Sequence, residues 1–297
     1  MSAVGLGTVL FGTHVDQGQA RGIIHRALDL GVTFLDTSDS YGRGASESLI
    51  GKILGPRRRD IVLATKFSSP MGEAPSQGGT SRRWMMQAVE DSLRRLRTDA
   101  IDLYQIHHPD PLTPIEETLR ALDDLVRSGK VKYVGYSNVA GWQIADGQWT
   151  ARAARLVQPV STTNHFNLAR RDPEREILPA CRAFGVSIIP YYPLESGFLT
   201  GRYRRDGQAD GIRLPRSARV ASVLTSANYD RLERWQAFAA SRGRSVVELA
   251  IGWLLGHAEV ASVIAGASSP EQVAGSVAAA AAWTLDGTEM AEVAALG

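Results

Sequence analysis

The chain has 297 residues, of which 44% are hydrophobic and 22% charged, and its formal net charge is +2 at pH 7. This composition is typical of a globular protein, and so small a net charge gives no field strong enough to predict binding to nucleic acid or to a membrane surface. The single cysteine, Cys181, excludes an internal disulfide framework and a cysteine-rich zinc site. We expect a cytoplasmic protein, because we find no secretory signal and no apolar span of the ~20 residues that a membrane-crossing helix needs.

Short apolar runs alternate with longer amphipathic segments along the whole chain. The segments predict helices, and the clearest are Gln17–Leu30, Ser46–Leu54, Arg82–Arg97, Thr113–Ser128 and Glu174–Phe184. The runs predict strands over Val4–Phe11, Val32–Leu35, Ile61–Thr65, Ile101–Ile106, Val131–Tyr136, Leu156–Val160, Val186–Pro190 and Val260–Ala265. Eight strand–helix units in a chain of this length are typical of a (β/α)8 TIM barrel. We therefore expect one α/β barrel domain over residues 1–297.

Boundary signals and two irregular segments refine this prediction. Thr113, followed by a proline, is expected to cap the helix that it begins, and Gly31 is expected to end an earlier helix. The connection from Tyr191 to about Ala227 is much longer than usual, which predicts a functional loop after the seventh strand. An extra helix over 245–256 is expected before the eighth strand. Because apolar residues nearly surround that helix, we expect it to be buried.

Polar residues follow three consecutive predicted strands. Asp36 and Tyr41 follow the second strand, Lys66 ends the third, and His107 and His108 end the fourth. Each alone has an ordinary structural explanation, such as a turn, a buried aromatic ring, a solvated charge or a hydrogen-bonded imidazole. Reactive groups of TIM barrels collect at the carboxyl ends of the strands, however, and adjacent strands place these residues at one rim. Their combination favours a reaction site.

The residue types in this set suit acid–base chemistry. A tyrosine has an unperturbed pKa of ~10, which is too high for an efficient proton donor near neutral pH. We expect the Lys66 ammonium to lower the pKa of Tyr41, and Asp36 to hold the lysine and partly compensate its charge. A histidine beside them is expected to steer a substrate oxygen toward the phenol by hydrogen bonding.

The chain resembles the aldo-keto reductases from about Gly5 to about Ala280. The motifs that carry the resemblance are Gly5–Thr8, Phe34–Gly42, Ala64–Lys66, Asp102–His107, Gly135–Asn138 and Pro190–Gly201. The resemblance implies a catalytic tetrad of Asp36, Tyr41, Lys66 and His107, and it favours His107 over His108 because the family's strand ends with its histidine. It also implies reversible hydride transfer from a nicotinamide dinucleotide to an aldehyde or ketone, with the tyrosine as general acid and without a metal.

The resemblance further implies NADP as the cofactor, with NADPH preferred to NADH. Tyr191 matches the aromatic residue that stacks on the nicotinamide ring, and Tyr192–Arg202 matches the loop that closes over the pyrophosphate. Val263–Gln272 matches the segment for the adenosine phosphate, at the start of the last helix. The residues implied to contact the cofactor are Gly7, Thr8, Val9, Asp36, Ser137, Asn138, Thr163, Tyr191, Tyr192, Leu194, Ser196, Gly197, Leu199, Arg202, Gly266, Ala267, Ser268, Gln272 and Ser276.

Several positions depart from the family pattern. Thr163 stands where a glutamine is usual, and Gly266 and Gln272 stand where a lysine and an arginine often hold the 2′-phosphate. Ser276, with the glycine before it, replaces the usual pair that clamps adenine. Glu195 places a negative charge in the pyrophosphate loop, so we expect it to point away from the phosphates or to pair with an arginine. The arginines over 202–219 fit a solvated loop and phosphate binding equally well.

Three functions are compatible with these residues. The leading hypothesis is an NADPH-dependent reductase of an aldehyde, ketone or sugar-like carbonyl. The weakened adenosine clamp allows a second, a nucleotide-binding regulatory module with little turnover. A third is a lysine-imine barrel such as an aldolase that uses Lys66, although the nicotinamide-loop motifs disfavour it. Loops around Phe67–Thr80, Val139–Gln148 and the end of the chain are expected to select the substrate.

Overall fold

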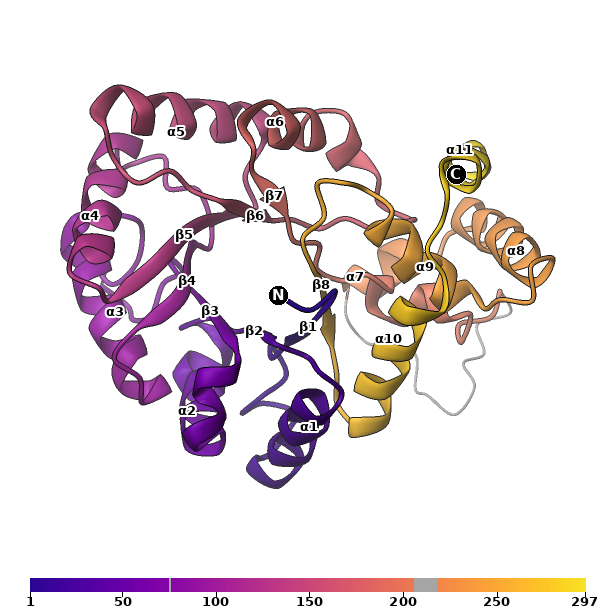
Figure 1. Cartoon of the computed structure of the whole chain (residues 1–297), viewed down its shortest axis with the longest axis horizontal. Coiled ribbons are helices and arrows are strands. Elements are labelled where there is room, and N and C mark those ends of the chain that lie inside the picture. Colours follow the sequence, from indigo (N-terminus) through magenta and orange to yellow (C-terminus); the bar gives the residue numbers. More distant parts are fainter. Residues whose placement is uncertain (75, 206–217) are drawn as a thin grey trace.

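Eight parallel strands curl into a barrel surrounded by helices in the computed structural model of the protein, which describes residues 1–74, 76–205 and 218–297 (Figure 1). Hydrogen-bonded neighbours follow the order β7-β6-β5-β4-β3-β2-β1-β8. Isolated parallel bridges, Ile188 to Val260 and Tyr191 to Ile264, close the remaining gap between β7 and β8. The predicted TIM barrel is therefore confirmed. The strands are β1 (Val4–Gly7), β2 (Phe34–Asp36), β3 (Val62–Phe67), β4 (Ile101–Ile106), β5 (Val131–Ser137), β6 (Ser161–Thr163), β7 (Ser187–Ile188) and β8 (Val263–Gly266).

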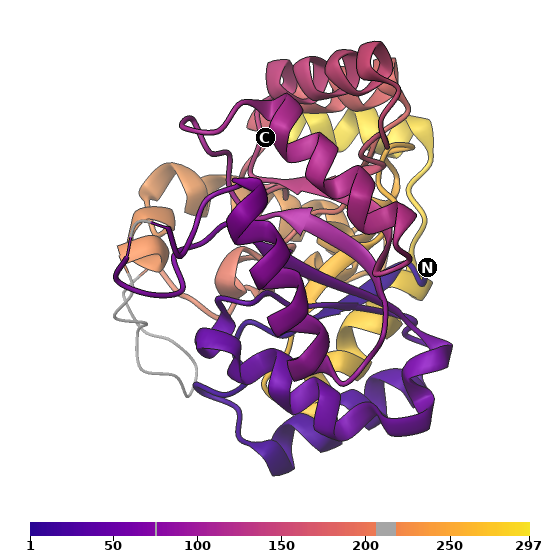
Figure 2. The ribbon, with the colours of Figure 1, turned by 90° about the vertical axis from the view of Figure 1, so that its left-hand side faces the viewer.

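The barrel contains two apolar layers. Inside it, Phe34, Ala64, Leu103, Ile189 and Ile264 form a small buried cluster from five different parts of the strand ring. A much larger core fills the space between the outer faces of the strands and the helices. Parallel strands covered on both faces read as nearly continuous apolar runs, which is why the sequence shows these strands clearly. Seen from the side, the strands lie within a wall of helices (Figure 2).

The helices begin and end largely where local signals place them. Gly31 adopts a φ of 79° after the first helix, which confirms the predicted stop. The extra helix is present as α9, and most of its residues are buried, as predicted. The α-helices are α1 (Gln17–Asp29), α2 (Ala45–Leu54), α3 (Arg82–Leu96), α4 (Ile115–Arg127), α5 (Gly141–Ala154), α6 (Ile177–Phe184), α7 (Ala218–Val223), α8 (Ser226–Ala240), α9 (Val246–Leu255), α10 (Pro270–Ala282) and α11 (Gly287–Leu296), with 3-10 turns at η1 (Tyr41–Gly44), η2 (Gly55–Asp60), η3 (Asp172–Glu174) and η4 (Glu195–Thr200).

Two predicted strands are wrong in their limits. The first ends at Gly7 instead of continuing to residue 11, because the chain turns there and the Phe11 amide donates to the Thr8 carbonyl. The sixth starts at Ser161, after the predicted run over 156–160. The Leu156 amide is still bonded to the Ala151 carbonyl at the end of α5, so those residues finish a helix before pairing begins.

Two further local predictions are corrected. The region over 139–148, expected to be a substrate loop, is mostly the first half of α5. Thr113 does not cap α4: Pro114 occupies the cap position, and the Thr113 hydroxyl donates to Asp110 Oδ2 at 2.8 Å. A nearby carboxylate is a stronger acceptor than the helix offers, so it takes the hydroxyl.

The long connection after β7 contains η4, α7 and α8, and α8 lies with α11 outside the ring of barrel helices, on the side of β8 (Figure 1). Part of this connection, and with it part of the arginine-rich stretch, falls at 206–217, outside the described residues. The segment matched to the adenosine phosphate precedes α10, which is followed by α11 and so is not the last helix. Among the helices of the described residues, none is long and apolar enough to span a bilayer.

Candidate active site

A cavity of about 230 Å³ opens at the carboxyl ends of the barrel strands. This is the rim where TIM-barrel enzymes carry their reactive groups. The four residues predicted as catalytic all line it, together with ten of those predicted to hold the cofactor, Asp36 belonging to both sets. The lining consists of Gly7, Thr8, Val9, Asp36, Tyr41, Lys66, His107, His108, Ser137, Asn138, Thr163, Tyr191, Tyr192, Ile264 and Gly266.

Lys66 forms the centre of the catalytic set. Its Nζ donates to Asp36 Oδ2 at 2.6 Å, to the Thr37 carbonyl at 2.9 Å and to the Tyr41 hydroxyl at 3.3 Å. Lys66 and Asp36 are 2% and 3% exposed. Asp36 is the last residue of β2 and Lys66 the fifth of β3, so neighbouring strands deliver both groups to one depth of the barrel. The ammonium thus bridges a carboxylate and a phenol, away from water.

The turn after β2 brings Tyr41 to this ammonium. The Tyr41 amide donates to the Ser38 carbonyl, and η1 then continues through two glycines with positive φ, Gly42 at 56° and Gly44 at 90°. A side chain at Gly44 would also collide with Arg95, since its Cβ would lie 2.7 Å from that residue's Cδ. Glycine is the residue that adopts such a conformation without strain, so the Gly-Arg-Gly sequence holds the phenol in place.

Burial sets the direction of the pKa shifts in this set. It raises the pKa of Asp36 despite the neighbouring Lys66 ammonium. It also raises the pKa of Tyr41, and the opposing effect of Lys66 does not reverse that shift. The expectation of a lowered Tyr41 pKa is therefore corrected, because loss of hydration of the phenolate outweighs the ammonium's attraction. The pKa of Lys66 is raised: burial lowers it, but Asp36 and Tyr41 together outweigh the burial.

His107 stands edge-on to the phenol and remains neutral. Its ring centroid lies 5.8 Å from that of Tyr41, with the planes at 77°. Burial, with the charge of Lys66 and then of His108, lowers the pKa of His107 to about 2. His108 stacks on His107 at 4.5 Å and also lines the cavity. The sequence therefore missed a lining role for the second histidine, for which its position directly after the strand end was the available signal.

A chain of hydrogen bonds connects the catalytic carboxylate to the next strands. Gln105 Nε2 donates to Asp36 Oδ1 at 3.2 Å, and Thr163 Oγ1 donates to Gln105 Oε1 at 2.6 Å. Ser137 Oγ then donates to the Thr163 carbonyl at 3.1 Å. Gln105 was not predicted as a site residue, although its inward position two residues before His107 could have indicated it. This chain fixes the orientation of the Asp36 carboxylate.

Asn138 and Tyr191 form the opposite wall of the cavity. Asn138 has a φ of 58°, and its Nδ2 donates to the His107 carbonyl at 2.9 Å. The Tyr191 hydroxyl donates to Asn138 Oδ1 at 2.7 Å, which fixes the orientation of the ring. His165 stacks on the Tyr191 ring at a centroid distance of 5.3 Å and an interplanar angle of 22°. The wall therefore presents a flat aromatic surface that is supported from behind.

Glu195 is buried and supports the loop after β7. Its Oε2 accepts from Asn167 Nδ2 at 2.6 Å and lies 2.7 Å from His165 Nε2. The same Asn167 amide donates to the Tyr192 carbonyl at 2.8 Å. Tyr192, Glu195 and Ser196 all have positive φ, so this segment is strained and needs such support. Of the two contacts expected for Glu195, the pairing with an arginine is thus replaced by a histidine and an asparagine.

The remaining residues predicted to hold the cofactor lie away from the cavity. Leu199 is fully buried in the core, and Ser276 is buried in α10, where its hydroxyl donates to the Gln272 carbonyl at 3.0 Å. Gln272 Oε1 accepts from the Ser268 amide at 2.8 Å, and Arg202 Nε donates to Thr200 Oγ1 at 3.0 Å. Like these, Leu194, Ser196, Gly197 and Ala267 are absent from the cavity lining. Their contacts with a cofactor stay a prediction.

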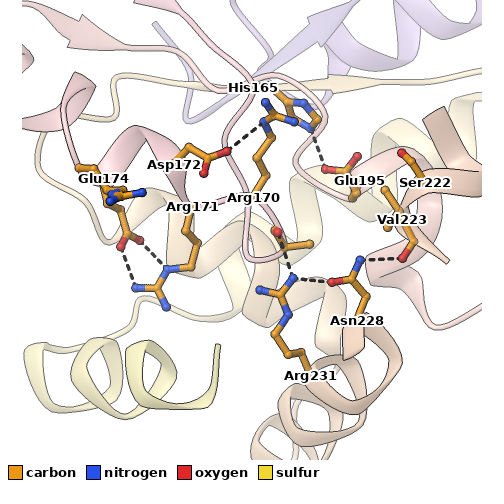
Figure 3. Close-up of a pocket in the computed structure, with 12 residues that line it drawn as sticks. His165, Arg170, Arg171, Asp172, Glu174, Glu195, Ser222, Val223, Asn228 and Arg231 are labelled. Carbon is orange, nitrogen blue, oxygen red and sulfur yellow. Dashed lines mark hydrogen bonds and ion pairs between the residues drawn. The ribbon is translucent and has the colours of Figure 1, made fainter. Parts of the chain in front are cut away.

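A larger hollow of about 710 Å³ lies beside the segment after β6 and helix α8 (Figure 3). Its charged side chains largely serve one another. Arg171 makes a two-point contact with the Glu174 carboxylate at 2.8 Å, and His165 faces Glu195. None of the four predicted catalytic residues lines this hollow, so the smaller cavity is the candidate active site despite its size.

Comparison with known proteins agrees with this geometry. The profile of the Aldo/keto reductase family matches residues 3–297. The chain is 35% identical over 285 residues to an uncharacterized oxidoreductase, YrpG, of Bacillus subtilis, covering 92% of this chain and 85% of the relative. It is 34% identical to a versiconal hemiacetal acetate reductase of Aspergillus parasiticus (86% and 82% covered) and 32% identical to a probable voltage-gated potassium channel subunit beta of Oryza sativa (89% and 83%). The chain belongs to the aldo/keto reductase family.

Proposed function

We propose that the protein reduces an aldehyde, a ketone or a sugar-like carbonyl to an alcohol with NADPH, and that Tyr41 is the general acid. The observation that carries this proposal is the buried contact of Lys66 Nζ with both Asp36 and the Tyr41 hydroxyl, at the strand ends of the barrel. Membership of a family that includes oxidoreductases supports the same reaction class. A reducing, cytoplasmic compartment is part of the proposal, since the only cysteine is free and buried.

The residues around the cavity fit a nicotinamide ring. Tyr191 offers a flat aromatic face, and Asn138 offers amide donors beside it. Across the cavity, a Cβ on Gly266 would meet no atom within 4 Å, so the glycine leaves room that a planar group can fill. We propose that these three residues hold the ring. We also propose NADPH in preference to NADH, on the family resemblance.

The bound nicotinamide would supply the hydride. The residues of the chain would supply the proton and position the carbonyl. Neutral His107 is suited to donate a hydrogen bond to the carbonyl oxygen, and the phenol of Tyr41, whose pKa burial raises, keeps its proton until the oxygen becomes basic. Lys66 then stabilises the phenolate that forms, since its ammonium already lies 3.3 Å from the hydroxyl.

The substitution Tyr41→Phe tests the general acid. Removal of a positioned acid typically costs 10²–10⁴-fold in rate, so we expect kcat for a test aldehyde to fall by about that factor. NADPH binding, followed by the change in its fluorescence, should remain close to that of the unaltered protein because Tyr41 does not hold the nucleotide in this proposal. Turnover near the normal rate in Tyr41→Phe would show that another group donates the proton.

A second candidate is a nucleotide-binding regulatory module with little turnover. Relatives in Oryza sativa, Schizosaccharomyces pombe and Arabidopsis thaliana are named as probable or putative channel beta subunits, at 32% identity. A panel of carbonyl compounds that gives no NADPH oxidation, despite measured nucleotide binding, would favour it. The lysine-imine alternative loses support from the structure. Lys66 is held in an ion pair and its pKa is raised, whereas imine formation needs a free amine.

A further inference from the structure

Asp39 is a buried acid that the proposed reaction does not use. It is fully shielded from solvent, two residues before Tyr41. Its Oδ2 has no hydrogen-bond partner within the described residues. Burial of a carboxylate without full compensation is costly, so an acid placed in this way beside an active site calls for a functional explanation.

One hydroxyl connects Asp39 to the imidazole of His107. Ser38 Oγ lies 3.2 Å from Asp39 Oδ1 and 3.1 Å from His107 Nδ1. The Ser40 amide also donates to Ser38 Oγ, at 3.2 Å. His107 Nε2 makes no hydrogen bond to any described residue that the structure records, and the ring lines the catalytic cavity. The carboxyl group and the substrate-facing nitrogen are therefore at opposite ends of one short chain.

The hydroxyl of Ser38 can donate only one hydrogen bond, and this limits the chain to two arrangements. If Asp39 is ionised, Ser38 donates to the carboxylate and accepts from His107, whose proton then sits on Nδ1. If Asp39 is protonated, the acid donates to Ser38, and Ser38 donates to Nδ1, which leaves the proton of the imidazole on Nε2. Either way the amide of Ser40 takes the remaining lone pair of Ser38, and the imidazole stays neutral.

We propose that Asp39 is a positioning residue that selects, through Ser38, which ring nitrogen of His107 carries the proton. With the proton on Nε2, the imidazole presents a donor to the cavity and can hold a carbonyl oxygen. With the proton on Nδ1, it presents a lone pair, which repels that oxygen. The consequence for turnover rests on the proposed carbonyl reduction, whereas the choice of tautomer does not.

The groups around Asp39 place this change near neutral pH. Burial, and then the carboxylate of Glu47 on α2, raise the pKa of Asp39 to about 7, against the lowering effects of Ser38 and of Arg95 on α3. Tyr104 on β4 also faces it, with a pKa raised well above its usual value, so that phenol stays neutral. Around His107, the charge of Lys66 and the stacked His108 keep the ring uncharged. Raising the pH through 7 should therefore move the His107 proton from Nε2 to Nδ1.

The experiment is a pH titration of the ¹⁵N-histidine-labelled protein by NMR, without substrate. We expect the two ring nitrogens of His107 to exchange their protonated and unprotonated types of ¹⁵N shift, with a midpoint near pH 7 and no ring charging. Asp39→Asn cannot titrate, so the tautomer should become independent of pH. Ser38→Ala should abolish the same dependence while Asp39 is kept, which covers the case in which the Asn variant folds poorly.

Ser69→Ala is the matched control, because Ser69 Oγ lies 3.2 Å from the same His107 Nδ1 but the carboxyl of Asp39 is linked through Ser38. It should leave the titration unchanged. A His107 tautomer that does not change between pH 5.5 and 8.5, roughly the span around the printed value, or one that responds to Ser69→Ala and not to Asp39→Asn, would overturn the proposal. If the titration appears but no carbonyl is reduced, the tautomer assignment stands and the proposed function fails.

Discussion

The ion pair of Lys66 and Asp36 makes a quantitative prediction about stability. Both side chains are almost completely buried, and Nζ lies 2.6 Å from Oδ2. The substitution Lys66→Met keeps most of the volume of the side chain and removes its charge. The carboxylate of Asp36 is then left with Gln105 Nε2, at 3.2 Å, as its donor among the side chains described.

Removal of one partner from a buried ion pair typically costs about 3–5 kcal/mol, so Lys66→Met should lower the free energy of unfolding by about that amount at pH 7. The sign of the pH dependence follows from the carboxyl group. Burial already raises the pKa of Asp36 above its ordinary value, and loss of Lys66 raises it further. A group with a raised folded-state pKa stabilises fully below its unfolded pKa and loses that stabilisation as pH rises through the folded value. The variant should therefore gain stability, relative to the unaltered protein, as pH falls from 8 toward 5.

Urea denaturation followed by tryptophan fluorescence measures this effect at several pH values. The double variant Asp36→Asn, Lys66→Met removes both charges and should recover most of the loss, because replacing both partners avoids a lone buried charge. Lys52→Met, at an exposed lysine of α2, is the control and should change stability by no more than about 0.5 kcal/mol. If Lys66→Met is as stable as the unaltered protein, or if the double variant is no more stable than the single one, the reasoning is refuted.

Three other predictions concern the walls of the site and the core. Glu195→Ala leaves the Asn167 amide without its acceptor, so we expect a loss of about 1–3 kcal/mol in urea denaturation, together with weaker nucleotide binding; unchanged binding would contradict the support given to the strained loop. Gly266→Ala places a methyl group in open space and should leave the unfolding midpoint unchanged while raising the Kd for NADPH, and equal affinity would place the nucleotide elsewhere. Cys181 is 1% exposed, and burial raises its pKa to about 12, so a thiol reagent at pH 8 should modify it only in unfolded protein; rapid labelling of the native state would disagree.

The sequence alone determined the barrel and the four residues of the candidate catalytic set. Alternation of apolar runs with amphipathic segments is a local property, and buried parallel strands make it strong. A strand delivers the residue at its carboxyl end to the same rim as its neighbours, so Asp36, Lys66 and His107 could be grouped without coordinates. The glycine at position 31 ended its helix as expected, because only the local backbone decides a positive φ.

The tertiary structure decided what depends on burial and on contacts between distant segments. Spacing predicted that Lys66 would lower the pKa of Tyr41, but the cost of removing the phenolate from water depends on everything packed around it, and burial prevails. The partner of Glu195 proved to be His165, 30 residues earlier, which no local pattern encodes. Asp39 read as an ordinary turn former in the sequence. Only the folded chain shows that it is sealed from solvent, with one hydroxyl between its carboxyl group and the catalytic imidazole.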